Sequence, residues 1–399
     1  MSSPNLSARR TAAAAFAVAL SLLFAACSDD STSSNGSDAT TTVVEDSPAP
    51  VPTVTEDTDP PATEPVRTDP VVTEPEVTVP VVGPWEAVTA PSDCMCSDGS
   101  EFQFFVREGN PAKVVLFFEG GGACFSAETC GPESETYKRA INSPAGLTDG
   151  IFDTDEERNP FLGWSMVYVP YCTGDVHIGN ATTDYGNGVV VEHKGYVNGN
   201  AALAELVQRF PDAMDLVVTG ESAGSVPTPL YAGLAGDLLP AARITVLGDG
   251  SGAYPDSDGL NAGIGALWGT PNAIPAWPEN EGLTAGDWSF PGLYVQAAAH
   301  APDIFFARHD YAYDKTQVQF ALLAGIPGED LMDLIDQNEV QIEASGVDLF
   351  SFITPGDRHT VLHKANFYSE EVNGVMLVDW VVALLSGEPL GDVHCTECR

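Results

Sequence analysis

A serine in the segment MDLVVTGESAGSVPTPL, which runs from Met214 to Leu230, has the surroundings of a catalytic nucleophile. The apolar residues DLVVT end at the pattern GESAG, and a helix-compatible stretch follows at once. In such a strand–turn–helix arrangement Gly220 and Gly224 leave room for a sharp turn, and the serine between them is strained and exposed. Ser222 is therefore predicted to be the nucleophile of a hydrolase. The alternative is a glycine turn that only joins a strand to a helix.

A serine nucleophile needs a histidine base and an acid, which hydrolases of this kind supply in the order Ser, acid, His. His359 is the predicted base, because it alone lies in a polar turn just past the last strand-like run; the other downstream histidines are His300, His309, His363 and His394. Three aspartates at or beyond strand ends compete for the acid. The usual order favours Asp310 or Asp314, and Asp249 is interpreted as a turn or helix-cap residue.

Backbone N–H groups must also stabilise the oxyanion that forms when serine attacks an ester. The segment VVLFFEGGGACF places Gly120, Gly121 and Gly122 directly after an early strand-like run. Glycines allow the backbone to approach a substrate closely. Together with the amide of Ala223, these glycines are predicted to form an oxyanion hole.

Elements of two kinds alternate along the chain, and they must position these residues. Short apolar runs predict strands at KVVLFFEG, SMVYVPYC, DLVVTG, RITVLGD, DIFFARHD and DLFSFITPG, and longer patterns between several of them predict helices, including NGNAALAELVQRF, AGSVPTPLYAGLAGDLL, DKTQVQFALLAGI, PGEDLMDLIDQNEV and VMLVDWVVALLSG. This alternation is typical of an α/β protein with a mostly parallel sheet and helices on both faces. The segments 126–163 and 251–295 are predicted to be long loops that form a lid or a rim.

Six short runs, LFFEGGGACFSAETC, YVPYCTGDVHIGN, TGESAGS, AYDKTQ, TPGDRHTVL and VHC, resemble in this order the pectin acetylesterase and Notum family of esterases. The resemblance spans roughly Cys94 to Cys398. It implies an α/β-hydrolase fold with Ser222 as nucleophile and His359 as base, and it selects Asp314 as the acid, because DKTQ matches the family's acid segment. It also implies that Gly120, Gly121 and Ala223 form the oxyanion hole and that no metal or organic cofactor is needed.

The resemblance also shows where this chain departs from the family. Gly122 stands where animal members have a bulky aromatic residue, so the shape of the acyl pocket does not transfer. No HExxH or HxH pattern supports a zinc-dependent hydrolase.

The 399-residue chain is predicted to have three parts. Residues 1–27 read as a lipoprotein signal peptide, because two arginines precede an apolar run too short to span a membrane and FAAC resembles a lipobox ending at Cys27. Residues 28–82, rich in Thr, Pro, Asp and Glu, are predicted to be a disordered tether. Residues 83–399 form the hydrolase domain. We thus expect an exported protein, anchored by lipid on Cys27 at the extracytoplasmic face of a membrane.

Seven further cysteines belong to the predicted domain, so at most three disulfides form within one chain and one thiol is left over. Cys124 and Cys130 are predicted to form a local bridge. The pairs in CMC and HCTEC are expected to join the start of the domain to its end, or alternatively to bind zinc through Cys94, Cys96, Cys395 and Cys398.

The sequence predicts a serine esterase whose most natural substrate is an acetylated polysaccharide. The alternatives are an esterase for longer acyl or lipid esters and an inactive lipoprotein that binds a glycan or a partner. A net charge of −41 excludes nucleic acid as a partner, because two polyanions repel each other.

Overall fold

The computed structural model describes residues 81–326 and 330–398 of the chain. The predicted signal peptide with Cys27, and the predicted tether up to residue 80, lie outside the described residues. Within the described residues no helix combines the length and the apolar character that a membrane crossing requires.

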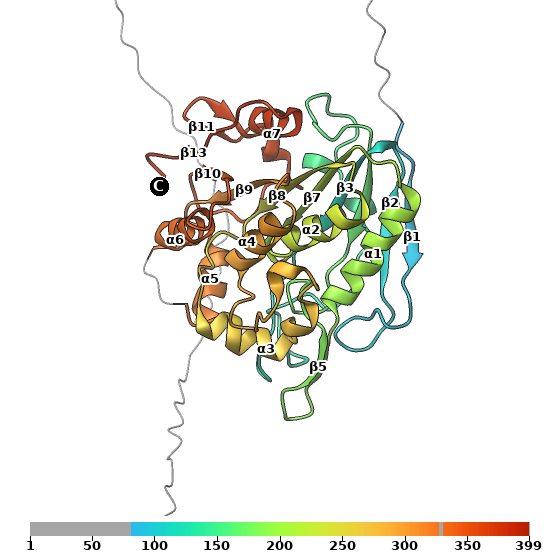
Figure 1. Ribbon diagram of the computed structural model, residues 1–399, viewed down its shortest axis with the longest axis vertical. Helices are drawn as coiled ribbons and strands as arrows, with labels where there is room; N and C mark the ends of the chain where they lie inside the picture. The colour runs from blue at the N-terminus through green and yellow to red at the C-terminus, as the bar shows by residue number, and fades with distance from the viewer. Residues whose placement is uncertain (1–80, 327–329, 399) are drawn as a thin grey trace, which may run out of the picture. The chain divides into compact units, whose positions relative to one another are not determined.

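A nine-stranded sheet forms the centre of the folded part (Figure 1). In spatial order its strands are β1 (Trp85–Thr89), β2 (Gln103–Arg107), β4 (Trp164–Val169), β3 (Asn110–Phe118), β7 (Asp215–Glu221), β8 (Arg243–Asp249), β9 (Phe305–Tyr311), β10 (Leu349–Thr354) and β13 (Val393–His394). The strands from β4 to β13 are parallel, and β1 and β2 join one edge antiparallel. All six predicted strands are present, which confirms the α/β fold. The antiparallel edge was not predicted.

Helices cover both faces of this sheet. Alternate side chains of each parallel strand point to opposite sides, so apolar strands have two apolar faces that helices must bury. In β3, Val114 and Leu116 pack into one core cluster and Val115 into the other. The helices are α1 (Gly195–Arg209), α2 (Thr228–Leu238), α3 (Gly265–Trp268), α4 (Phe290–His300), α5 (Lys315–Leu323), α6 (Leu331–Glu343) and α7 (Leu377–Ser386). Residues of α1, α2, α4 and α6 pack into the first cluster and residues of α7 into the second. Two small antiparallel ribbons, β5–β6 (Ala181–Asp184 and Val190–His193) and β11–β12 (Glu371–Val372 and Val375–Met376), lie outside the main sheet.

The two segments predicted to be long loops differ in the structure. Residues 126–163 contain only two 3-10 turns, as expected for a loop. Residues 251–295 contain a π-helical turn (Gly259–Ile264), α3 and the start of α4, so this segment is more ordered than the prediction. Gly269 ends α3 in a left-handed conformation, and Pro271, Pro278 and Pro291 lie in the first turns of short helices, where these residue types are favoured.

Three disulfides join cysteines of the described residues: Cys96–Cys172, Cys124–Cys130 and Cys395–Cys398. The predicted local bridge between Cys124 and Cys130 is confirmed. The expectation that the CMC and HCTEC pairs join the two ends of the domain is wrong, because Cys96 pairs with Cys172 near the end of β4 and the last two cysteines pair with each other. Cys94 is a buried free thiol, so these four cysteines do not form a zinc site either.

Candidate active site

Ser222 lies at the sharp turn between β7 and α2, as the sequence predicts. Its φ angle is 53°, in the left-handed region that non-glycine residues rarely adopt. The turn is so tight that a Cβ on Gly220 would lie 2.2 Å from the Gly224 carbonyl oxygen, and one on Gly224 would lie 2.1 Å from the Phe118 carbonyl oxygen. Both glycines are therefore required by the close approach of the turn to itself and to β3.

Asp314 and His359 lie together at the same edge of the sheet. Nδ1 of His359 is 2.6 Å from Oδ2 of Asp314, and the Asp314 side chain is fully buried. Asp314 also caps α5, where its Oδ1 accepts the N–H groups of Thr316 and Gln317. The Gln317 amide donates to Oδ2 at 3.2 Å. Three further hydrogen bonds thus hold the carboxylate that contacts the imidazole, which is the relation that a catalytic acid has to its base.

Asp310, the competing acid, does not meet His359. Its Oδ2 is 2.9 Å from Nε of the buried Arg308, and its Oδ1 accepts N–H groups from Gly252 and Gln317. Burial raises the pKa of Asp310, an effect that the charge of Arg308 and these hydrogen bonds partly offset. Asp310 therefore lies behind the Asp314–His359 pair, linked to it through Gln317.

Asp249 is neither a turn nor a cap residue, so that prediction is wrong. It is the last residue of β8, it pairs in register with His309 of β9, and it is fully buried. Its Oδ1 is 2.8 Å from Nδ1 of His309, and its Oδ2 accepts the N–H groups of Val361 and Leu362 at 2.7 and 2.9 Å. Burial by itself would raise the pKa of Asp249, but these partners lower it below the ordinary value. Asp249 thus fastens the loop that carries His359.

A second contact joins this loop to the nucleophile turn. His363 forms an ion pair through Nδ1 with Oε2 of Glu221, the residue before Ser222. Burial opposes the charge on His363, but the Glu221 carboxylate raises its pKa above the ordinary value. Lys364 donates from Nζ to the carbonyl oxygen of His359 at 2.5 Å. The contact between His363 and Glu221 was not predicted from the sequence, although Glu221 is a visible acidic residue inside GESAG.

The remaining histidines have other partners: His300 stacks on Trp277, His309 bonds Asp249 and Thr354, and His394 bonds Ser351.

The predicted oxyanion-hole residues border the serine. A Cβ on Gly120 would lie 3.0 Å from Cβ of Ser222, so the Gly120 backbone lies against Ser222. Gly121 follows it and accepts the N–H of Lys138 through its carbonyl oxygen. Ala223 is the second residue of a 3-10 turn, Ser222–Gly224, whose first N–H groups have no partner within the turn. The arrangement leaves backbone donors beside Ser222 for a negatively charged oxygen.

An apolar cavity opens at Ser222. It is lined by Gly122, Ala123, Phe125, Val176, Ser222, Ala223, Val226, Tyr254, Leu260, Trp268, Phe290, Phe320 and Ala324. The centres of water molecules could occupy only about 40 Å³ of it, which corresponds to roughly three waters. Four of its lining residues come from the segment 251–295. This segment therefore forms a wall of the cavity. The sequence had predicted a lid or a rim for it.

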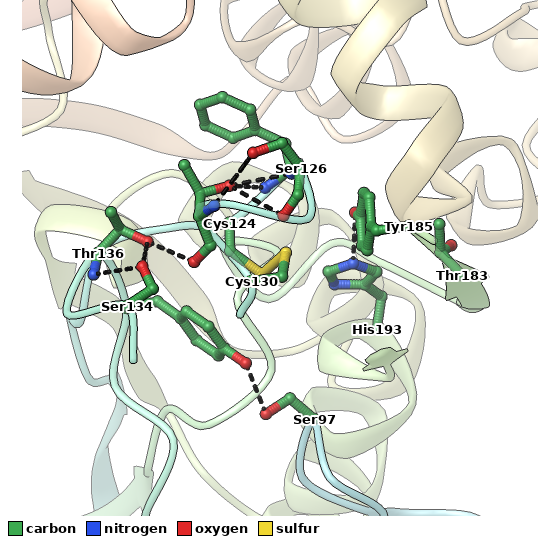
Figure 2. The surroundings of a disulfide bond; sticks show 12 residues. Ser97, Cys124, Ser126, Cys130, Ser134, Thr136, Thr183, Tyr185 and His193 are labelled. Atoms are coloured by element: carbon green, nitrogen blue, oxygen red, sulfur yellow. Dashed lines mark hydrogen bonds between the residues drawn. A yellow bond between two sulfur atoms is a disulfide. The ribbon is translucent and has the colours of Figure 1, made fainter. Parts of the chain in front are cut away.

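The Cys124–Cys130 disulfide, whose surroundings Figure 2 shows, lies next to lining residues of the cavity along the chain. Cys124 lies between two lining residues, Ala123 and Phe125, and its carbonyl oxygen accepts the indole N–H of Trp268 at 2.7 Å. His193 lies beside the disulfide, and its Nε2 is 2.8 Å from the hydroxyl of Tyr185. The two sulfurs and His193 are close enough to ligate a metal, but the disulfide removes both thiolates. This group thus stabilises structure.

Known proteins match the part of the chain that builds this site. A model of the pectinacetylesterase family matches residues 83–263. The palmitoleoyl-protein carboxylesterase notum1 of Xenopus laevis is 31% identical over 179 residues, which cover 41% of this chain and 35% of the relative. The inactive palmitoleoyl-protein carboxylesterase notum1b of Danio rerio is 31% identical over 113 residues, which cover 27% of this chain and 78% of the relative. The chain thus spans about a third of notum1 and over two thirds of notum1b.

A solved structure, that of the Wnt deacylase Notum from Drosophila, is similar in fold. Its TM-score is 0.57 at 18% sequence identity, and the similarity covers 79% of this chain and 97% of that chain. At this identity the likeness concerns the architecture of the sheet and helices.

Proposed function

This chain belongs to the pectin acetylesterase and Notum family, and from that premise we propose that it is a serine carboxylesterase. One matched relative is described as inactive, so membership of the family does not by itself imply catalysis. The observation that carries the proposal is the hydrogen-bonding contact of 2.6 Å between His359 and the buried Asp314, at the sheet edge where Ser222 is held in a strained turn. A chain that had lost activity would have no reason to keep all three groups.

In the proposed mechanism, Ser222 Oγ attacks the carbonyl carbon of an ester while His359 takes its proton at Nε2. Asp314 accepts the Nδ1–H of the same ring, fixes its tautomer and stabilises the imidazolium. The N–H groups of Gly120, Gly121 and Ala223 stabilise the oxyanion. His359 then returns the proton to the departing alcohol and leaves an acyl-serine. Water, deprotonated by His359, attacks this intermediate, and the acid is released from Ser222.

The acyl group is proposed to be acetyl. The names of the matched family and relatives contain two acyl groups, acetyl and palmitoleoyl. Room for about three water-sized groups suits the methyl and carbonyl of an acetyl group, whereas a palmitoleoyl chain has many more carbons than this cavity can hold. The apolar lining favours the methyl group over water.

The alcohol is proposed to be a polysaccharide. The export predicted from residues 1–27 would place the enzyme outside the cytoplasm, where acetylated glycans are encountered. Esters of longer acyl groups are the second candidate, and they require that the cavity opens when a substrate binds.

The test is hydrolysis of 4-nitrophenyl esters from acetate to octanoate, and release of acetate from an acetylated polysaccharide, by the full chain. Wild type is expected to prefer acetate, and Ser222→Ala to lose at least about a thousandfold in kcat while still folded. Ser345→Ala, which removes an exposed hydroxyl just after the end of α6, is the control and should equal wild type. If a fluorophosphonate fails to label Ser222 and no ester is hydrolysed, the chain is a binding protein and the proposal is wrong.

A further inference from the structure

Helix α5 brings the proposed catalytic acid and an aromatic ring to the same site. Asp314 caps the start of this helix and contacts His359. Phe320 and Ala324 follow at a spacing of four residues, which puts them on one side of the helix, and both line the cavity at Ser222. The position of the Phe320 ring is thus tied to the element that holds the acid.

The Phe320 ring lies between two hollows. One is the apolar cavity at Ser222, in which water centres could occupy about 40 Å³. The other is an open hollow of about 610 Å³, measured in the same way, and apolar atoms of residues such as Tyr137, Lys138 and Ala140 supply most of its lining. Gly122 and Phe320 line both hollows. The backbone at Gly122 and the Phe320 ring therefore form the partition between the cavity at Ser222 and the open hollow.

Gly122 has no room for a side chain because of this ring and of a neighbouring loop. Its φ angle is 75°, and a Cβ would lie 2.0 Å from the Thr136 carbonyl oxygen and 2.9 Å from Cζ of Phe320. The wall on this side of the cavity is thus supplied by a side chain of α5 instead of one from the glycine-rich loop. A ring on a helix can be truncated without changing the oxyanion-hole backbone.

We propose that Phe320 determines the acyl length that this enzyme accepts, by closing the cavity at Ser222 against the neighbouring hollow. The proposal rests on the esterase function proposed above. With the ring in place, an acyl group ends within the cavity and short acyl esters are preferred. Without the ring, the cavity joins the hollow, and a longer chain passes over Gly122 while its ester carbonyl stays at Ser222.

The test compares the full-length wild type with Phe320→Ala on 4-nitrophenyl acetate, butyrate, hexanoate and octanoate. Each methylene that finds an apolar wall instead of water contributes about 0.8 kcal/mol, or roughly fourfold in kcat/KM. Two or three newly accommodated methylenes are expected to raise the octanoate-to-acetate ratio of kcat/KM by at least about tenfold. Leu322→Ala is the matched control, because it truncates an apolar side chain of the same helix that is 65% exposed. Its ratio should equal that of wild type.

Phe320→Leu keeps an apolar contact and guards against a variant that fails to fold. It is expected to shift the ratio in the same direction by a smaller factor. An unchanged ratio in a folded Phe320→Ala, or in Phe320→Leu if the alanine variant does not fold, overturns the proposal. This result is distinct from failure of the esterase function, in which wild type hydrolyses no ester and Ser222 takes no fluorophosphonate label.

Discussion

Replacing Asp249 by alanine tests whether a buried carboxylate that does not contact His359 holds this proposed base in place. Three N–H donors converge on this carboxylate, from His309, Val361 and Leu362. All of them are buried, and each unpaired donor costs about 1–3 kcal/mol. With all three donors left unpaired, we expect the free energy of unfolding of Asp249→Ala to fall by at least about 3 kcal/mol.

The same substitution should reduce turnover, because two of the donors lie only two and three residues beyond His359. A displacement of the base by about 1 Å lowers the rate on the order of a hundredfold. We expect kcat to fall with little change in KM, since Asp249 does not line the cavity. Asp249→Asn should be milder, about 1–2 kcal/mol, because its amide oxygen can still accept both backbone N–H groups.

Urea unfolding and ester hydrolysis measure the two effects. Asp237→Ala is the matched control: Asp237 also contacts a histidine, with 2.8 Å between its Oδ1 and Nε2 of His300, but its side chain is 46% exposed. An exposed pair of this kind contributes less than about 1 kcal/mol, and the indole N–H of Trp277, which Asp237 also accepts at 2.9 Å, adds about 1 kcal/mol. The pKa of Asp249 is lowered, so its stabilising effect is complete above its ordinary value of 3.8 and is lost as the pH falls through the lowered value. If Asp249→Ala is no more destabilising than Asp237→Ala, the carboxylate does not hold the loop.

Two further predictions concern stability. The Cys96–Cys172 disulfide closes an interval of 76 residues, and Cys124–Cys130 closes one of only 6. Replacing the first pair by alanines should lower the free energy of unfolding in urea by about 4.5 kcal/mol, and replacing the second pair by about 2 kcal/mol. Equal losses would contradict the loop-entropy argument. Burial lowers the pKa of His177 to about 4. As the pH falls, His177 is therefore protonated in the unfolded chain before it is protonated in the folded one. Its contribution to stability is complete above about pH 6.5, and stability falls by up to about 3 kcal/mol towards pH 4. His177→Gln should flatten thermal stability over this pH range, and a slope equal to that of wild type would show that His177 is not the group that titrates.

The local pattern of the chain was enough to predict the elements and the nucleophile turn. Apolar runs of strand length and longer helical patterns are local properties, so all six predicted strands lie where the sequence places them. The turn at Ser222 could be predicted because its glycines are demanded by backbone contacts within a few residues and with one neighbouring strand. Three strands of the main sheet were missed: β1 and β13, which lie at its two edges, are short and not fully buried, and β2 has only five residues.

The choice among three aspartates required tertiary structure. Asp249, Asp310 and Asp314 all lie at or just beyond the ends of strands, and from residue types alone the sequence left the acid open. Only the path of the chain beyond β9 and β10 decides that Asp314 meets His359, while Asp310 meets Arg308 and Asp249 meets the backbone of the histidine loop. The resemblance to a family had selected the same aspartate, Asp314.

The cysteine pairing and the size of the cavity at Ser222 likewise could not be predicted from the sequence. Disulfides depend on which cysteines lie a few ångströms apart after folding, and Cys96 meets Cys172 because the sheet places its segment beside the end of β4. The cavity is built by Phe320 from α5 together with side chains from the segment 251–295, which are far from Ser222 in the chain. The sequence by itself thus determined the fold class and predicted the turn at Ser222. The tertiary structure decided which groups surround it, because those contacts join residues that no local pattern connects.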